Sequence, residues 1–152
     1  MYILDSDIFS LAYTVTNPNI PLRNRIARAG KNNIFLSIVT VKQSCAGATA
    51  LVGRYNRPRE PRLVFAYDVF EKVLRAVGAL RILPFDEQCY AIQIDDNQIP
   101  RNVKNHHPED SRIAATALRF DMTLVTRNTD DYEGIQNLRV ENWMDNPPAA
   151  QA

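Results

Sequence analysis

The sequence predicts an α/β domain of three layers, α/β/α, built around a central and mostly parallel sheet. Short apolar segments alternate with longer segments of helical pattern along the chain, which is the order that helices covering a parallel sheet produce. Most of the short segments are continuously apolar at their centres, as is typical of parallel strands buried on both faces. The length of 152 residues corresponds to about one domain of this kind.

Five segments have the character of short buried strands. In chain order they are residues 2–4, 33–38, 81–83, 123–126 and 138–141. We expect Trp143 to pack against the last of them.

Six helical segments fill the intervals between and after these strands. The first follows Asp7, and the others cover about residues 21–29, 41–55, 63–77, 86–98 and 108–120. Thr40 and Gln43 match a capping box, in which a hydroxyl is followed three residues later by Glu or Gln, so we expect the third helix to begin near Thr40. Gly78 is expected to cap the end of the fourth helix.

The segments belong to one folded domain over residues 1–143. The chain ends in DNPPAAQA, a segment with no apolar pattern to hold it against a core, so we expect residues 144–152 to form a flexible tail.

Composition and charge exclude several classes of protein. A net charge of +1 gives no overall field that would attract nucleic acid or a membrane surface, so any such attraction must be local. No apolar run reaches the roughly 20 residues that span a bilayer, and the first residues do not resemble a signal peptide. Cys45 and Cys89 are too few for a disulfide framework and lack metal-ligand spacing. We therefore expect a protein of the reducing cytoplasm.

Two acids separated by one residue follow the first strand. Asp5 and Asp7 come directly after the apolar segment YIL. Open parallel sheets bind ligands beyond the carboxyl ends of their strands, where the strand order reverses, so these acids are candidates for an active site. Alternatively, one of them only caps the following helix. That alternative suits Asp7 and explains Asp5 poorly, because Asp5 still belongs to the strand.

Further acids follow at two later positions. Asp110 begins the apolar stripe of the segment PEDSRIAATALRF, so its carboxylate should point inward, where an unpaired charge is costly to bury. Asn128, Asp130 and Asp131 crowd the loop after the strand TLVT. Asn and Asp are common turn residues, but this loop follows a strand that comes directly after the Asp110 helix.

Four segments in order resemble the PIN-domain nucleases, and most closely the VapC-type toxin ribonucleases of toxin–antitoxin systems. They read YILDSDIF, SIVTVKQSCAG, EDSRIAATAL and TLVTRNTDDYEGIQNLRVENW. The resemblance extends over essentially residues 1–143 and implies a PIN-like domain there. It also implies an RNA substrate, a cognate antitoxin protein as partner, and a homodimer.

The resemblance further implies a cluster of acids that holds one or two Mg²⁺ or Mn²⁺ ions for the hydrolysis of RNA phosphodiester bonds. Asp5 and Asp110 match two acidic positions of the family, and Asp131 falls in the loop that supplies the fourth. Asn128 and Asp7 are additional candidate metal ligands. Hard cations prefer such oxygen ligands and lower the pKa of a bound water molecule.

Gln43 stands where the family normally has a glutamate. This difference keeps an oxygen ligand but removes a negative charge, so metal affinity should fall. Three alternatives stay open: one ion is held well enough, Asp7 compensates, or catalysis is weakened or lost. We expect a metal-binding nuclease of reduced activity, with Gln43 at the catalytic site.

The segment GRYNRPREPR offers positive charge for RNA. Guanidinium groups bind phosphates, and Tyr55 within the segment could stack on an unpaired base. A solvated loop explains any single arginine equally well. His106 and His107 are expected to be plain surface residues of a polar loop. The candidate RNA-binding residues are Arg54, Arg57, Arg59 and Arg62.

Two other functions fit parts of the sequence. A strand ending in Asp-x-Asp is also the nucleophile signature of haloacid dehalogenase phosphatases, in which Asp5 would be phosphorylated and Asp7 would be the acid/base. That class also needs a later lysine, and none follows Lys104. With Gln43 in place, the domain could alternatively bind RNA or a protein partner without catalysis.

Overall fold

The computed structural model describes residues 1–15, 17 and 19–144. Its five-stranded sheet has the order β3-β2-β1-β4-β5, and each neighbouring pair is parallel. The α/β/α fold class is confirmed, and the sheet is parallel throughout the described strands. These are β1 (Tyr2–Leu4), β2 (Ile34–Ser37), β3 (Arg81–Leu83), β4 (Thr123–Val125) and β5 (Arg139–Glu141).

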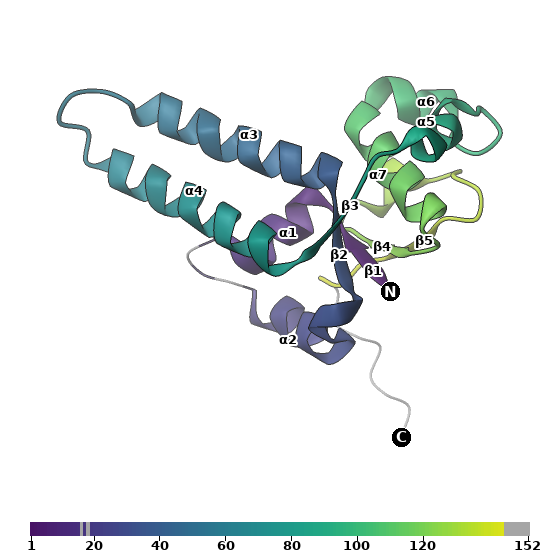
Figure 1. The fold of residues 1–152 in the computed structure, drawn as a ribbon, viewed down its shortest axis with the longest axis horizontal. Helices are drawn as coiled ribbons and strands as arrows, with labels where there is room; N and C mark the ends of the chain where they lie inside the picture. Colours follow the sequence, from purple (N-terminus) through teal and green to yellow (C-terminus); the bar gives the residue numbers. More distant parts are fainter. Residues whose placement is uncertain (16, 18, 145–152) are drawn as a thin grey trace.

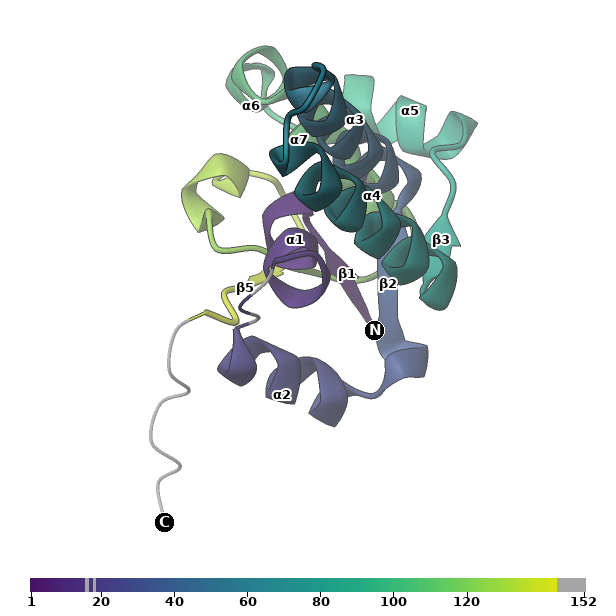
Figure 2. The same cartoon turned by 90° about the vertical axis from the view of Figure 1, so that its left-hand side faces the viewer.

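Helices cover both faces of the sheet (Figures 1 and 2). α3 and α4 lie side by side as a long hairpin that projects from the sheet (Figure 1). Two short 3₁₀ helices, η1 (Lys31–Asn33) and η2 (Thr129–Tyr132), lie in the connections. The α-helices are α1 (Ser6–Tyr13), α2 (Ile20–Ala29), α3 (Ile38–Tyr55), α4 (Arg62–Ala79), α5 (Glu87–Ile94), α6 (Arg101–His106) and α7 (Pro108–Arg119).

The two faces of the sheet bury separate cores, because successive residues of a strand point to opposite faces. Ile3 pairs in register with Phe35 on one side and with Leu124 on the other, and this row packs against α5, α6 and α7. The next row is centred on Leu4 and packs against α1, α2 and α4. The inner strands β1, β2 and β4 are thus almost entirely buried, which explains their continuous apolar character, whereas the edge strands β3 and β5 are partly exposed.

The strand order reverses beside the central strand β1. The chain runs from β1 through β2 to β3 on one side and then crosses to β4 on the other. Asp5 directly follows β1 and Thr126 directly follows β4, and the N–H of Asp5 donates to the carbonyl of Val125 at 3.1 Å. The carboxyl ends of these two strands therefore meet at the place where open α/β sheets bind ligands.

The boundaries of α3 and α4 differ from the predicted ones. α3 begins at Ile38, because the hydroxyl of Ser37 accepts a hydrogen bond from the N–H of Thr40 at 2.9 Å and caps the helix. The capping box predicted at Thr40 and Gln43 is therefore wrong, and Gln43 lies one helical turn further inside. Gly78 does not cap α4, which continues to Ala79.

α6 occupies a segment for which no helix was predicted. The helix predicted over residues 86–98 ends at Ile94, where Asp95 begins a turn and accepts a hydrogen bond from the N–H of Asn97 at 2.9 Å. Val103 of α6 is buried in the core. His107 lies at the junction between α6 and α7, so the polar loop predicted around the histidines is wrong.

Trp143 packs at the final strand as predicted. It is 5% exposed, its ring contacts that of Tyr2 edge-on at 4.8 Å between centroids, and its Nε1–H donates to the Glu141 carboxylate at 2.6 Å. The predicted tail, residues 144–152, lies outside the described residues except for Met144. Among the described helices, none has the length and hydropathy to cross a membrane.

Candidate metal centre

A pocket of about 160 Å³ opens at the carboxyl ends of β1 and β4. Four parts of the chain line it: the start of α1, the first half of α3, the start of α7 and the segment after β4. Every residue predicted for catalysis or metal binding lies on this pocket. The full lining is Asp5, Ser6, Asp7, Gln43, Asp110, Thr126, Asn128, Asp131 and Tyr132.

Asp5 is the most buried acid of the pocket, with 6% of its surface exposed. Its Oδ1 accepts a hydrogen bond from the N–H of Ile8 at 2.7 Å and caps α1. Burial raises the pKa of Asp5 to about 6, while the hydroxyl of Thr126 and the N–H of Ile8 lower it and nearby acids raise it. The cap therefore belongs to Asp5 and not to Asp7, contrary to the prediction, and the capping carboxylate also lines the pocket.

Asp7 lies at the rim of the pocket and is paired with Arg127. The Nη2 and Nε atoms of Arg127 approach Oδ2 of Asp7 at 2.7 Å and 2.9 Å. This pair offsets the charge of Asp7, so Asp7 attracts a cation less than an unpaired acid would. Arg127 was not singled out from the sequence, although it stands two residues after the end of β4, a position from which a side chain can reach this edge.

Asp110 and Asp131 face each other at the pocket with His107 beside them. The distance from His107 Nδ1 to Asp110 Oδ2 is 3.5 Å, and from His107 Nε2 to Asp131 Oδ1 it is 3.7 Å. One potential ligand atom from each of the three residues lies within 4.8 Å of the others. Burial and then the charge of Asp131 raise the pKa of Asp110, while His107 lowers it. His107 is thus part of the acidic cluster, and its prediction as a plain surface residue is wrong.

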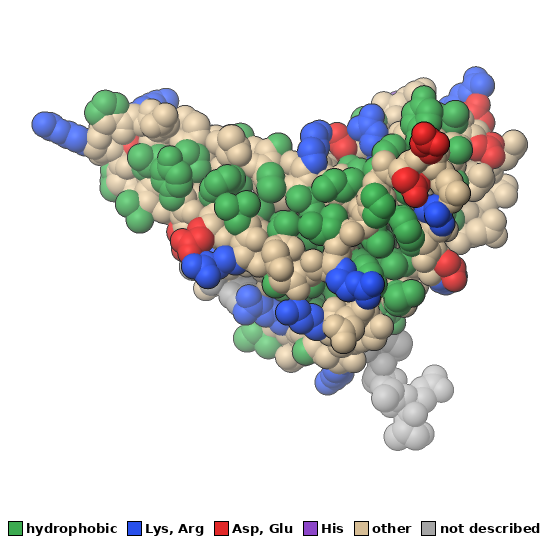
Figure 3. Space-filling view, viewed as in Figure 1, with side chains coloured by type: hydrophobic (Ala, Val, Ile, Leu, Met, Phe, Trp, Pro, Cys, Tyr) green, Lys and Arg blue, Asp and Glu red, His purple; other side chains and the backbone are tan. Residues whose placement is uncertain are grey.

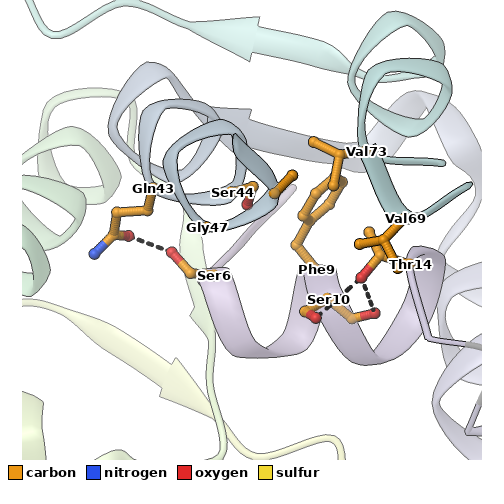
Figure 4. Close-up of a pocket in the computed structure, with 10 residues that line it drawn as sticks. Ser6, Phe9, Ser10, Thr14, Gln43, Ser44, Gly47, Val69 and Val73 are labelled. Carbon is orange, nitrogen blue, oxygen red and sulfur yellow. Dashed lines mark hydrogen bonds between the residues drawn. The ribbon is translucent and has the colours of Figure 1, made fainter. Parts of the chain in front are cut away.

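Gln43 reaches the pocket from α3, and its side-chain oxygen accepts a hydrogen bond from the hydroxyl of Ser6 (Figure 4). Both residues also line a neighbouring pocket of about 270 Å³ between α1, α3 and α4, where Phe9 and Val73 supply apolar surface (Figure 4). Since Ser37 caps the helix, Gln43 has no capping role, and its amide is held at the mouth of the acidic pocket.

Tyr132 lines the acidic pocket with a buried hydroxyl. The residue is 4% exposed, and its hydroxyl makes no hydrogen bond of ordinary geometry within the described residues. Burial, followed by the charges of Asp110 and Asp5, raises its pKa. Asn128 and Asp131 complete this side, whereas Asp130 is exposed and is not among the lining residues.

The residues of the pocket fit a hard divalent cation. Carboxylate and amide oxygens are the ligands that Mg²⁺ and Mn²⁺ take. Beside burial, the charges of neighbouring acids raise the pKa values of Asp5 and Asp110, and a bound cation would relieve that repulsion. The buried hydroxyl of Tyr132 beside the same acids, which makes no hydrogen bond of ordinary geometry within the described residues, is a further sign of an incomplete polar site.

The arginines predicted to bind RNA lie away from this pocket. α3 has 18 residues, which gives a length of about 27 Å at 1.5 Å per residue, and its loop to α4 is at the end that points away from the sheet (Figure 1). Figure 3 shows basic side chains at this end. Arg62 is held by the carboxylate of Glu60 at 2.7 Å and 2.9 Å and lies 4.7 Å over the ring of Tyr55. All four predicted arginines are exposed: Arg54, Arg57, Arg59 and Arg62.

No family model matches the chain, but a curated protein does. Toxin FitB of Neisseria gonorrhoeae (strain ATCC 700825 / FA 1090) is 31% identical over 118 residues, which cover 74% of this chain and 78% of that toxin. The match therefore extends over most of both proteins.

Several solved structures share the fold. The structure of FitAB bound to the IR36 DNA fragment is similar with a TM-score of 0.72 and 27% identity, over 98% of this chain and 99% of that chain. FitAcB from Neisseria gonorrhoeae is similar with a TM-score of 0.69 and 26% identity, over 95% of this chain and 99% of that chain. DNA-bound VapBC from Salmonella typhimurium has a TM-score of 0.67 and 22% identity, over 93% of this chain and 97% of that chain. At this identity the likeness is one of fold alone.

Proposed function

The chain belongs to the VapC-type toxin family of PIN-domain proteins, and from this membership we propose that it is a metal-dependent endoribonuclease. The observation that carries the proposal is the meeting of Asp5, Asp110 and Asp131 in one pocket at the reversal of the strand order. These three carboxylates would hold Mg²⁺ or Mn²⁺, with Asn128 and Gln43 offering neutral oxygens. An RNA phosphodiester is the substrate.

When bound, the ion supplies Lewis acidity and lowers the pKa of a water molecule, so that RNA hydrolysis can proceed at neutral pH. The side chains of the pocket hold the metal-binding carboxylates in place and offset charge at the rim. Asp5 is fixed by its hydrogen bond to the start of α1, and Asp110 by the first turn of α7. Tyr132, whose pKa is raised, stays a neutral donor that can hydrogen-bond an anion. Arg127 offsets the charge of Asp7 at the rim, which lowers the repulsion that an incoming phosphate meets.

Gln43 reduces the metal affinity of the site and with it the activity. Asp7 does not restore the missing charge, because Arg127 is already paired with it. Of the three alternatives that the sequence leaves open, we therefore favour a site that works with one ion held mainly by Asp5, Asp110 and Asp131. Its activity is lower than that of a site with glutamate at position 43.

Protein partners, and the parts of the RNA away from the cleaved bond, engage other surfaces of the molecule. α4 exposes the apolar side chains of Val64, Phe65 and Tyr67, and hydrophobic side chains extend over the α3–α4 hairpin in Figure 3. Such apolar surface supports an interface with a protein, and the complexes named FitAB and VapBC among its structural relatives support an antitoxin partner. We extend the proposal to a homodimer, to RNA contact by the exposed arginines of the hairpin loop, and to the cytoplasm, where the free thiols of Cys45 and Cys89 would persist.

RNA cleavage in the presence and absence of Mn²⁺ tests the proposal. The natural protein should cleave a mixed set of RNAs with Mn²⁺ and not with a chelator. Asp5→Asn should abolish cleavage, and Gln43→Glu should increase both Mn²⁺ affinity and rate by about tenfold, or about 1.4 kcal/mol. Asp130→Asn is the matched control, because Asp130 lies in the same loop as Asp131 but not on the pocket, and it should leave cleavage unchanged.

Two outcomes would refute the proposal, and each would indicate a different function. If neither the natural protein nor Gln43→Glu cleaves any RNA with Mn²⁺, the domain binds RNA or a partner without catalysis. A phosphate trapped on Asp5 would indicate a phosphatase. The structure disfavours that second outcome, since none of the described residues that line the pocket is a lysine and Asp7, its required acid/base, is paired with Arg127.

A further inference from the structure

His107 is held at the junction of two helices with its ring turned to the acids. Its N–H donates to the carbonyl of Val103 at 2.8 Å, and its carbonyl accepts from the N–H of Ser111 at 2.9 Å. Pro108 follows, and the steric restriction that a proline places on the preceding residue limits its backbone further. The imidazole makes no capping hydrogen bond and lies between Asp110 and Asp131.

The separations within this trio fit ligands of one ion. In an octahedral site with bonds of about 2.1 Å, neighbouring ligand atoms are about 3 Å apart and opposite ones about 4 Å. With one ring nitrogen of His107 and one carboxylate oxygen from each of Asp110 and Asp131, the three ligand atoms lie within 4.8 Å of one another, slightly beyond the larger of these values. Small side-chain rotations would therefore close the three ligand atoms on one cation.

A separate observation marks the same place as a ligand site. The hydroxyl of Tyr132 is buried without a hydrogen bond of ordinary geometry in the described structure, and it lines the pocket beside Asp110 and Asp131. A buried hydroxyl is normally satisfied by protein or by ordered solvent. Bound water in the shell of an ion at this trio would satisfy it.

We propose that His107 is a ligand of the ion, and that its nitrogen shifts the preference of the site from Mg²⁺ towards Mn²⁺. The inference rests on the proposed function, because it concerns the same pocket. Mg²⁺ is a hard ion that keeps oxygen ligands, whereas imidazole suits transition ions. Gln43 acts in the same direction, since a site with one carboxylate fewer holds Mg²⁺ less well. An uncharged nitrogen also completes the ligand set without adding to the repulsion between Asp110 and Asp131.

The competing explanation is that His107 only pairs with the two acids as a cation. In that case it would occupy the place of a metal ion and would be displaced when one binds. The two explanations differ in whether the imidazole nitrogen is bonded to the ion.

Pulsed EPR of the Mn²⁺-loaded full chain distinguishes them, because a coordinated imidazole gives a nitrogen coupling to the manganese electrons. We expect this coupling in the natural protein and in the control His106→Ala. His106 is the adjacent histidine, exposed and close to the carbonyl of Asn102 through Nδ1 at 2.9 Å. The coupling should vanish in His107→Gln and in His107→Asn, two variants that keep a polar side chain. Calorimetric titration should show Mn²⁺ affinity falling about tenfold in both, and Mg²⁺ affinity changing by less than about twofold.

Mn²⁺ bound without nitrogen coupling would overturn this inference and leave the proposed function intact. Failure of the natural protein to bind Mn²⁺ at all would overturn both. An equal loss of coupling in His106→Ala would also refute it, since the signal would not report His107.

Discussion

Asp5 shows how one residue can serve the fold and the site with opposite consequences for stability. Its hydrogen bond to the N–H of Ile8 caps α1, which typically contributes about 1 kcal/mol. Its burial raises its pKa from 3.8 to about 6, so holding the ionised carboxylate in the folded protein costs roughly 3 kcal/mol at neutral pH. The acid is therefore placed for its charge and not for stability, as is common at functional sites.

The raised pKa of Asp5 predicts how the stability of the protein depends on pH. The folded-state pKa of Asp5 lies above its unfolded value, so the folded protein binds the proton more tightly. The resulting stabilisation is present below about pH 4 and is lost as the pH rises through about 6. Asn at this position keeps the capping oxygen and does not ionise. The free energy of unfolding of the metal-free natural protein should thus fall relative to Asp5→Asn by about 2 kcal/mol between pH 4 and pH 7.

Urea denaturation in the presence of a chelator, at a series of pH values, measures this difference. If the free energies of unfolding of the two proteins differ by the same amount at every pH, a buried, ionising Asp5 is contradicted. If the natural protein instead loses stability relative to Asp5→Asn as the pH falls, the contradiction is stronger, because the pKa shift would have the opposite sign.

The acids of the site could be predicted from sequence, while His107 and Arg127 could not. Asp5, Asp110 and Asp131 stand beside strand ends and at a helix entrance, and those boundaries follow from apolar patterns. The position of His107 depends on α6, a helix of six residues that is too short to show a periodic pattern. The pairing of Arg127 with Asp7 depends on the spatial relation of β1 and β4, which local sequence does not contain.

At the scale of elements, the start of α3 determines what Gln43 can do. Ser37 and Thr40 both carry a hydroxyl suited to capping, so the local pattern alone does not decide between them. The structure does, because the hydroxyl of Thr40 is buried and donates to the carbonyl of Leu4 at 3.3 Å, while Ser37 stands at the helix entrance. Gln43 is consequently in the second turn of α3, where its side chain faces the acids.

The α3–α4 hairpin carries the arginines proposed to bind RNA, and they lie far from the acidic pocket. Replacing Arg57 and Arg59 together by alanine should weaken RNA binding and should reduce the slope of affinity against salt by about 1.4, which corresponds to two phosphate contacts on a single strand. The measurement is RNA binding in the Asp5→Asn background, where no substrate is consumed, at several salt concentrations.

The matched control for this hairpin replaces Lys72 and Arg75 together by alanine. Both lie on α4 and pair with acids one turn away, Lys72 with Asp68 at 2.7 Å and Arg75 with Glu71 at 2.6 Å, so their removal changes the net charge by the same two units without touching the loop. Equal losses in the control and in the loop variant would mean that only net charge matters. An unchanged affinity of the loop variant would remove the loop from the RNA-binding surface.

At the scale of the whole molecule, the strand order is what brings the acids together. The fold class and the five strands could be predicted because each strand has an apolar residue at its centre, and the inner strands β1, β2 and β4 are mostly apolar and buried. The order β3-β2-β1-β4-β5 places β1 at the centre, and its residue Asp5 then lies beside the segment that follows β4. The extent of the domain over residues 1–143 remains a prediction, and the described packing of Trp143 supports it.

A structure determined from crystals grown with Mn²⁺, using the anomalous scattering of manganese, tests the central claim most directly. We expect a single strong manganese peak in the pocket at the ends of β1 and β4, with carboxylate oxygens of Asp5, Asp110 and Asp131 bonded to it. A pocket without manganese at saturating concentration, or an ion bound only on another surface, would contradict the claim that these residues form a metal centre.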